Sequence, residues 1–66
     1  MDPKYPLIHV QLTGQDSNAF MIIGLVMKAL RKAGVPQSEI DEFGDEATSG
    51  DYNNVIATAM RWVTVS

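Results

Sequence analysis

Residues 13–24 read TGQDSNAFMIIG, and at this stretch the chain changes from strand-like to helix-like patterning. In the preceding run, Tyr5 to Thr13, apolar and polar residues alternate, and this period of two predicts a strand. Gly14 interrupts the alternation, and the side chains of Ser17 and Asn18 can accept hydrogen bonds from the free N–H groups of a first helical turn. We therefore expect a strand that ends here and a helix that begins near residue 17 or 18.

The expected helix runs to about Ala33, because Gly34 can adopt the left-handed conformation that ends many helices. Its apolar residues recur with the helical period and share one face. These residues are Ala19, Ile22, Ile23, Val26, Leu30 and Ala33. Met21 and Leu25 fall outside that face, near the charged sector, and we expect them to be partly exposed in a monomer.

Two further helices follow. Residues 37–47, QSEIDEFGDEA, come after Pro36 and repeat apolar residues at helical spacing, which predicts the second helix. Ser49 or Asp51 can cap a third helix that carries an apolar stripe. The chain then closes with the β-branched run 62–66, WVTVS, which is typical of a short final strand.

The fold prediction is a single small α+β domain over residues 1–66, in the order β-α-α-α-β, with the helices packed on a short two-stranded sheet. Agreement between the helical stripes and the alternating run supports it. The expected core consists of Ile8, Val10, Leu12, Ile22, Ile23, Val26, Leu30, Ile40, Phe43, Tyr52, Val55, Ile56, Ala59 and Val63.

Composition narrows the class of protein. A chain of 66 residues buries a small core, and without cysteine it cannot gain stability from a disulfide, so oligomerisation is the common remaining device. The sequence has no secretory signal pattern and no apolar run of the roughly 18 residues that span a bilayer. We expect a soluble, cytoplasmic protein with no membrane contact.

Catalysis, metals and cofactors are not expected. The acidic run 41–51, DEFGDEATSGD, places Phe43 where a calcium loop needs an oxygen ligand, so a solvated acidic face is favoured. His9 is the single histidine, and no catalytic partner can be placed beside it. The sequence also lacks the glycine-serine elbow and the paired-histidine zinc pattern of known hydrolases. We predict no catalytic residues, no metal and no cofactor.

The sequence contains two candidate binding sites, one for a small anion and one for nucleic acid. The turn before the first helix could hold a small anion at Gly14, Ser17 and Asn18, but it lacks the glycines of a phosphate loop, and a plain capped turn is favoured. A basic helix face could contact nucleic acid through Lys28, Arg31 and Lys32, with Arg61 as a fourth contact. The net charge of −3 and the favourable placement of cations at a helix end favour a solvated face instead.

Four stretches carry a resemblance to known sequences. The spaced pattern TG-x-D-x-NAF-x-IIG is followed by ALR-x-AG, EATSGDY and TAMRWV, over about residues 12–65. Together they resemble a family of short bacterial, phage and plasmid proteins with no assigned activity. The resemblance implies a compact independent domain, and it implies no cofactor or catalytic residue.

The leading functional hypothesis is a noncatalytic protein-interaction module that self-associates as a homodimer or docks on a partner protein. The candidate interface residues are Met21, Leu25, His9 and Trp62. The open edges of the expected strands are a second route to pairing with another copy. The alternatives are a nucleic-acid-associated protein that uses the basic helix face, or a small-anion binder at the turn over residues 13–18.

Overall fold

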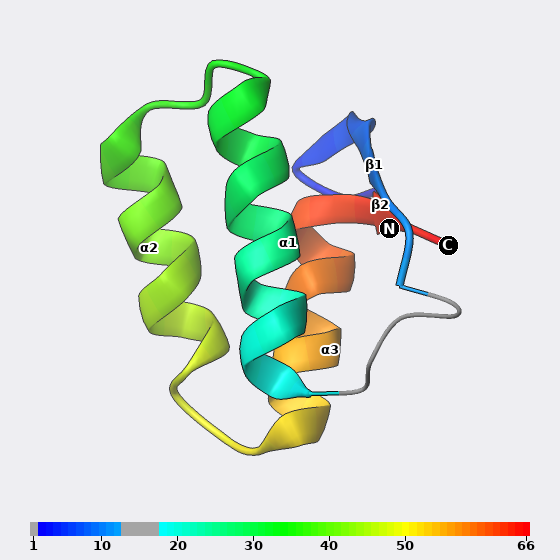
Figure 1. Cartoon of the computed structure of the whole chain (residues 1–66), viewed down its shortest axis with the longest axis vertical. Coiled ribbons are helices and arrows are strands. Elements are labelled where there is room, and N and C mark those ends of the chain that lie inside the picture. Colours follow the sequence, from blue (N-terminus) through cyan, green and yellow to red (C-terminus); the bar gives the residue numbers. More distant parts are fainter. Residues whose placement is uncertain (1, 13–17) are drawn as a thin grey trace.

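The computed structural model describes residues 2–12 and 18–66 (Figure 1). Its elements are β1 (Tyr5–Val10), α1 (Ala19–Lys32), α2 (Gln37–Ala47), α3 (Tyr52–Trp62) and β2 (Val63–Val65). The two strands, which come from opposite ends of the chain, pair in parallel. The predicted α+β class and the order β-α-α-α-β are confirmed.

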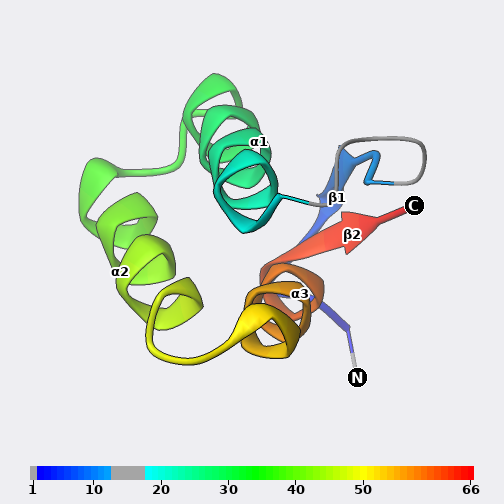
Figure 2. The same ribbon diagram turned by 60° about the horizontal axis from the view of Figure 1, so that its bottom comes forward.

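The helices and the sheet form three layers. Figure 2, which looks nearly along the helices, shows α2 on one side, α1 and α3 in the middle and the sheet on the other side. Helix α1 contacts α2, α3 and β1, while β2 continues directly from α3 and packs on it. Three neighbours therefore cover α1, and its remaining side faces solvent.

The helix ends follow the capping residues of the sequence. The side chain of Asn18 accepts a hydrogen bond from the backbone N–H of Phe20, and that of Asp51 accepts one from Asn54. Asp51, and not Ser49, is therefore the cap of α3. Gly34 has φ 87°, the left-handed conformation expected of it after α1.

Strand β1 is shorter than predicted and it is interrupted. It ends at Val10, because β2 offers only three residues to pair with. Tyr5 lies opposite Val63 but His9 lies opposite Thr64, so the intervening residues of β1 bulge out of the ladder. The hydroxyl of Thr64 donates to the carbonyl of Pro6 across this bulge at 2.8 Å. Simple alternation of side chains therefore fails in the first half of the strand.

The core differs from the prediction at its margins. Ile8, Leu12 and Ile56 are half-buried, and Tyr52 is 42% exposed. Tyr52 is the first residue of α3 and lies over a surface hollow, which explains why it stays outside the core. The buried apolar residues are Val10, Ile22, Ile23, Val26, Leu30, Ile40, Phe43, Ala47, Val55, Ala59, Trp62 and Val63.

Candidate interaction surface on helix α1

The solvent-facing side of α1 carries an unusual mixture of residues for a helix of this length. Ile22, Val26 and Leu30 are buried on the inner side. At about 100° per residue, Phe20, Met21, Gly24, Leu25 and Lys28 fall on the other side, and we call these five residues the outer face of α1.

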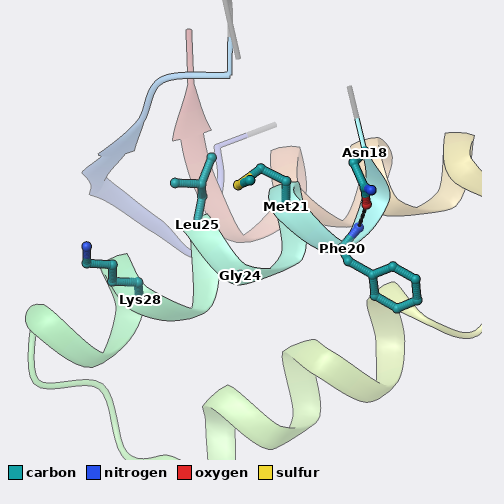
Figure 3. Close-up of a pocket in the computed structure, with 6 residues that line it drawn as sticks. All are labelled: Asn18, Phe20, Met21, Gly24, Leu25 and Lys28. Carbon is teal, nitrogen blue, oxygen red and sulfur yellow. Dashed lines mark hydrogen bonds between the residues drawn. The ribbon is translucent and has the colours of Figure 1, made fainter. Parts of the chain in front are cut away.

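Large apolar side chains on this outer face are in contact with water. Phe20 is 81% exposed, Met21 is 47% exposed and Leu25 is half-buried. Together with Asn18, Gly24 and Lys28 they line an open hollow of about 500 Å³. Figure 3 shows Phe20 projecting from one side of the helix and Met21 and Leu25 from the other, with Gly24 between them.

A second, smaller hollow adjoins the first at Phe20. It has a volume of about 240 Å³ and lies between the N-terminal ends of α1 and α3. Its lining includes the partly exposed Tyr52 and the buried Ile23 and Val55 besides Phe20. Phe20 therefore stands between two concave apolar surfaces, and the apolar region extends beyond α1 itself.

At the other end of the outer face the character changes from apolar to basic. A hollow of about 350 Å³ is lined by His9 of β1 and by Lys28 and Lys32 of α1, over Val10, Leu25 and Ala29. Leu25 and Lys28 line both this hollow and the apolar one, so the two are continuous. The packing of β1 on α1 thus places His9 beside Lys28 and Lys32, two of the cations considered as nucleic-acid contacts.

Three of the five cationic side chains make no ion pair within the described part of the chain. These are Lys28, Arg31 and Lys32, all of which are exposed on α1. The other two are paired with glutamates of α2: Lys4 Nζ lies 2.7 Å from Glu39 and Arg61 Nη2 lies 2.8 Å from Glu46. The unpaired cations are therefore confined to the helix that also carries the exposed Phe20 and Met21.

Two sequence-selected residues lie elsewhere. Trp62 is only 4% exposed, and its ring meets Phe43 edge-on at 5.6 Å between centroids, so it serves the core and is not available to an interface. Arg61 donates to Glu46 through two guanidinium nitrogens, at 2.8 and 3.2 Å, and does not extend the unpaired basic face. Trp62 Nε1 donates to the other oxygen of Glu46 at 3.2 Å.

The hydrogen bonds that Glu46 and Glu39 accept lower the pKa values of both carboxyl groups. The hydrogen bonds from Arg61 and then from Trp62 hold the pKa of Glu46 below its ordinary value. On the same side of α2, hydrogen bonds from Lys4 and Tyr5 likewise lower the pKa of Glu39. Both carboxylates join α2 to the chain ends, so this side of the molecule is tied by charged hydrogen bonds.

The turn considered as an anion site is only partly described. Gly14 and Ser17 lie outside the described residues, and Asn18 uses its side-chain oxygen to cap α1. Among residues 2–12 and 18–66, no three acidic or histidine side chains are grouped closely enough to hold a metal ion. No helix in the same ranges has both the length and the apolar character to cross a membrane.

Sequence reasoning identified Met21 and Leu25 but missed Phe20 and Gly24. A helical projection of the sequence could have identified Phe20. At about 100° per residue, Phe20 lies roughly 115° from the centre of the buried stripe, and so outside the core-facing side. The second hollow could not be found in this way, since it depends on how α3 packs beside α1. The position of His9 beside Lys28 and Lys32 likewise depends on tertiary packing.

Comparisons with models of known families, with curated proteins and with solved structures find no match to this chain. The resemblance to short bacterial, phage and plasmid proteins therefore stays a prediction. The functional argument rests on the geometry of this chain alone.

Proposed function

We propose that this chain is a noncatalytic interaction module that associates with a second copy of itself through the outer face of α1. The observation that carries the proposal is the exposure of Phe20 and Met21 on a helix whose opposite side is fully buried. Burying such a side chain contributes about 1.5–3 kcal/mol at full burial. Leaving both in water forgoes a large share of the stability available to so small a domain.

Ion pairing elsewhere in the described residues supports this choice of location. Cations outside α1 are paired with carboxylates, and each buried side-chain polar atom in the described residues has a hydrogen-bond partner. The bulge in β1, which includes Pro6, interrupts the ladder along one strand, and bulges of this kind discourage pairing between sheet edges. Helix packing is thus favoured over the strand pairing considered from the sequence.

Sedimentation equilibrium from about 10 to several hundred micromolar tests the proposal by mass action. We expect the apparent mass to rise from 7.2 kDa toward twice that value, and the melting temperature to rise with concentration. A mass of 7.2 kDa over the whole range, with an unchanged melting temperature, contradicts self-association.

A pair of methionine variants tests the location. Met21→Lys places a charge on the outer face of α1 and should raise the dissociation constant at least about tenfold. Met60→Lys is the matched control, because Met60 is 55% exposed on α3 and does not line the hollows beside Phe20. Both exchanges have nearly the same helix propensity. Equal effects of the two variants contradict this location.

A second candidate function is association with nucleic acid through Lys28, Arg31 and Lys32. The observation that favours it is that these three cations are exposed, unpaired within the described residues, and joined by His9. Phosphates would supply the missing counter-charges, and binding would weaken steeply as salt concentration rises.

Titration with mixed duplex and single-stranded DNA and RNA at low salt tests this candidate. Lys28→Gln combined with Lys32→Gln should weaken binding and reduce its salt dependence. Ser38→Glu combined with Asn53→Glu is the control, because it changes the net charge by the same amount at exposed sites on α2 and α3. Equal loss in both variants indicates only a non-specific effect of net charge, and no binding at low salt removes the candidate.

A further inference from the structure

Within the described residues, neither the backbone conformation nor the packing requires glycine at position 24. Gly24 lies within α1 and is exposed, and among the described glycines only Gly34 has a positive φ. A Cβ atom built on Gly24 meets no atom of the described residues within 4 Å. Glycine destabilises a helix interior relative to alanine, so the folded monomer bears a cost here without a packing reason.

Gly44, within α2, provides the contrast. A Cβ atom there would lie 3.9 Å from the terminal methyl carbon of Met27, an ordinary van der Waals contact. An added methyl group at Gly44 is thus accommodated against a neighbouring helix, whereas at Gly24 it would project into solvent. The two positions form a matched pair of helix-interior glycines that differ in what lies beyond them.

The neighbours of Gly24 indicate what could approach it. Phe20 precedes it by one turn and Lys28 follows it by one turn, so the three residues form a row along α1 (Figure 3). Phe20 stands beside the hollow that has Gly24 in its lining. The outer face therefore carries both a projection and a recess, which is what a self-complementary contact requires.

We propose that two copies pack α1 against α1 in antiparallel orientation about a two-fold axis at Gly24, so that the Phe20 ring of each copy covers Lys28 of the other. This inference rests on the proposed function and specifies its geometry. Absence of a side chain at Gly24 lets the two helix backbones approach closely. Residues one turn before and one turn after the crossing point then lie opposite each other.

Charge selects the antiparallel orientation. In a parallel pair, Lys28, Arg31 and Lys32 would lie beside their own copies, and like charges at such distances repel. In the antiparallel pair the two basic ends lie far apart, and the helix dipoles oppose each other favourably. The cation of Lys28 meets an aromatic ring of the other copy, an attractive contact that it does not make with any described residue of its own chain.

The available area predicts weak association. A standard interface takes about 800 Å² from each partner, which is roughly a fifth of the 4276 Å² exposed by this chain. A contact made mainly by one helix of 14 residues is smaller than that. We expect a dissociation constant of about 10–500 micromolar.

The glycine pair gives the first test. Gly24→Ala should raise the midpoint of urea unfolding measured at low micromolar concentration, where the chain is monomeric, and should raise the dissociation constant at least about tenfold. Gly44→Ala should also raise the unfolding midpoint but leave the dissociation constant unchanged. A dimer that is equally tight in Gly24→Ala and in the parent chain overturns the crossing at Gly24.

Intermolecular nuclear Overhauser effects give the second test. In a mixture of isotope-labelled and unlabelled chains at about one millimolar, we expect contacts between the Phe20 ring of one copy and the Lys28 methylenes of the other. Contacts between Phe20 and its own copy, or between Phe20 and β1 or α3 of the other copy, overturn the arrangement and leave self-association standing. A chain that stays monomeric at every concentration overturns the arrangement and the proposed function together.

Discussion

The two phenylalanines of this chain stand in opposite surroundings. Phe43 of α2 is fully buried, packs edge-on against Trp62 and lies on the side of the molecule where Glu46 binds α3. Phe20 of α1 is mostly exposed and lines two hollows, one of which extends to Lys28, a cation with no ion-pair partner among the described residues. The side chains of the first region have their partners within one chain, and we call it the complete region; the second region leaves a large apolar side chain in contact with water.

The difference separates side chains that the monomer needs for folding from side chains that it leaves exposed. Replacing a residue in the complete region removes contacts that the monomer uses, so its effect appears in the free energy of unfolding. Replacing a residue on the outer face of α1 removes few such contacts, so its effect should appear in association. Comparing variants of the two regions therefore tests this distinction.

The largest expected effect is that of Phe43→Ala. Removing a fully buried phenylalanine costs about 3–5 kcal/mol, comparable with the whole stability of a domain of this size, and the variant should be largely unfolded at 25 °C. Phe20→Ala should change the unfolding free energy by less than about 0.5 kcal/mol at low concentration. Urea unfolding followed by Trp62 fluorescence measures both, and similar losses would erase the distinction between the regions.

Acid should weaken the complete region selectively. Folding lowers the pKa of Glu46 and of Glu39, so their contribution is fully present well above 4.5, the ordinary value, and is lost as pH falls through the lowered values. We expect Glu46→Gln to reduce the unfolding free energy at pH 7 by about 1 kcal/mol, since this partly exposed pair is screened by solvent. The variant should also lose less stability than the parent chain between about pH 5 and pH 3. An unchanged pH profile contradicts this role of Glu46.

The helix caps should give nearly equal effects in the two regions. Asp51→Ala at the start of α3 and Asn18→Ala at the start of α1 each remove a side-chain acceptor for a backbone N–H, at a cost of about 1 kcal/mol. Thermal unfolding of both variants measures the difference. A much smaller loss for Asn18→Ala would mean that the first turn of α1 contributes less to folding than the first turn of α3.

The smallest effect is expected for Lys28→Gln. The side chain has no ion-pair partner in the described residues and precedes the like-charged Arg31 and Lys32 at helical spacing, so the unfolding free energy should change by less than about 0.5 kcal/mol. Arg61→Gln removes the charged hydrogen bonds to Glu46 and should cost more. Chemical denaturation of both variants at one pH measures the two losses of stability. A larger loss for Lys28→Gln than for Arg61→Gln would contradict the expected order.

Local signals in the sequence predict much of this fold. Helix α2 spans the 37–47 segment expected from its apolar spacing and from Pro36 before it, and Gly34 adopts the conformation assigned to it. Such features depend on residues within one or two turns of each other. The sequence therefore predicts the helices more accurately than it predicts the strand or the surface.

Features that depend on distant residues were not predictable. Trp62 and Val63 are both buried although they are adjacent, because the backbone changes there from helix to strand and turns both side chains inward. The bulge of β1 depends on Thr64, nearly the whole chain away from Pro6. Within the candidate site, Met21 and Leu25 were found by periodicity, whereas the hollows and the position of His9 depend on tertiary packing.

The parallel pairing of β1 and β2 has a mechanical consequence. Because the strands are parallel, the start of β1 and the end of β2 lie at opposite ends of the strand pair. A force that pulls these two points apart acts along the strands and loads the interstrand hydrogen bonds in shear. Bonds from Lys4 N to Arg61 O and from Leu12 N to Ser66 O lie near the two ends of this pair. Under this load the interstrand hydrogen bonds must break together, and not one after another. The strand pair therefore resists a force applied at the start of β1 and the end of β2, and this force does not reach the three helices until the pair separates.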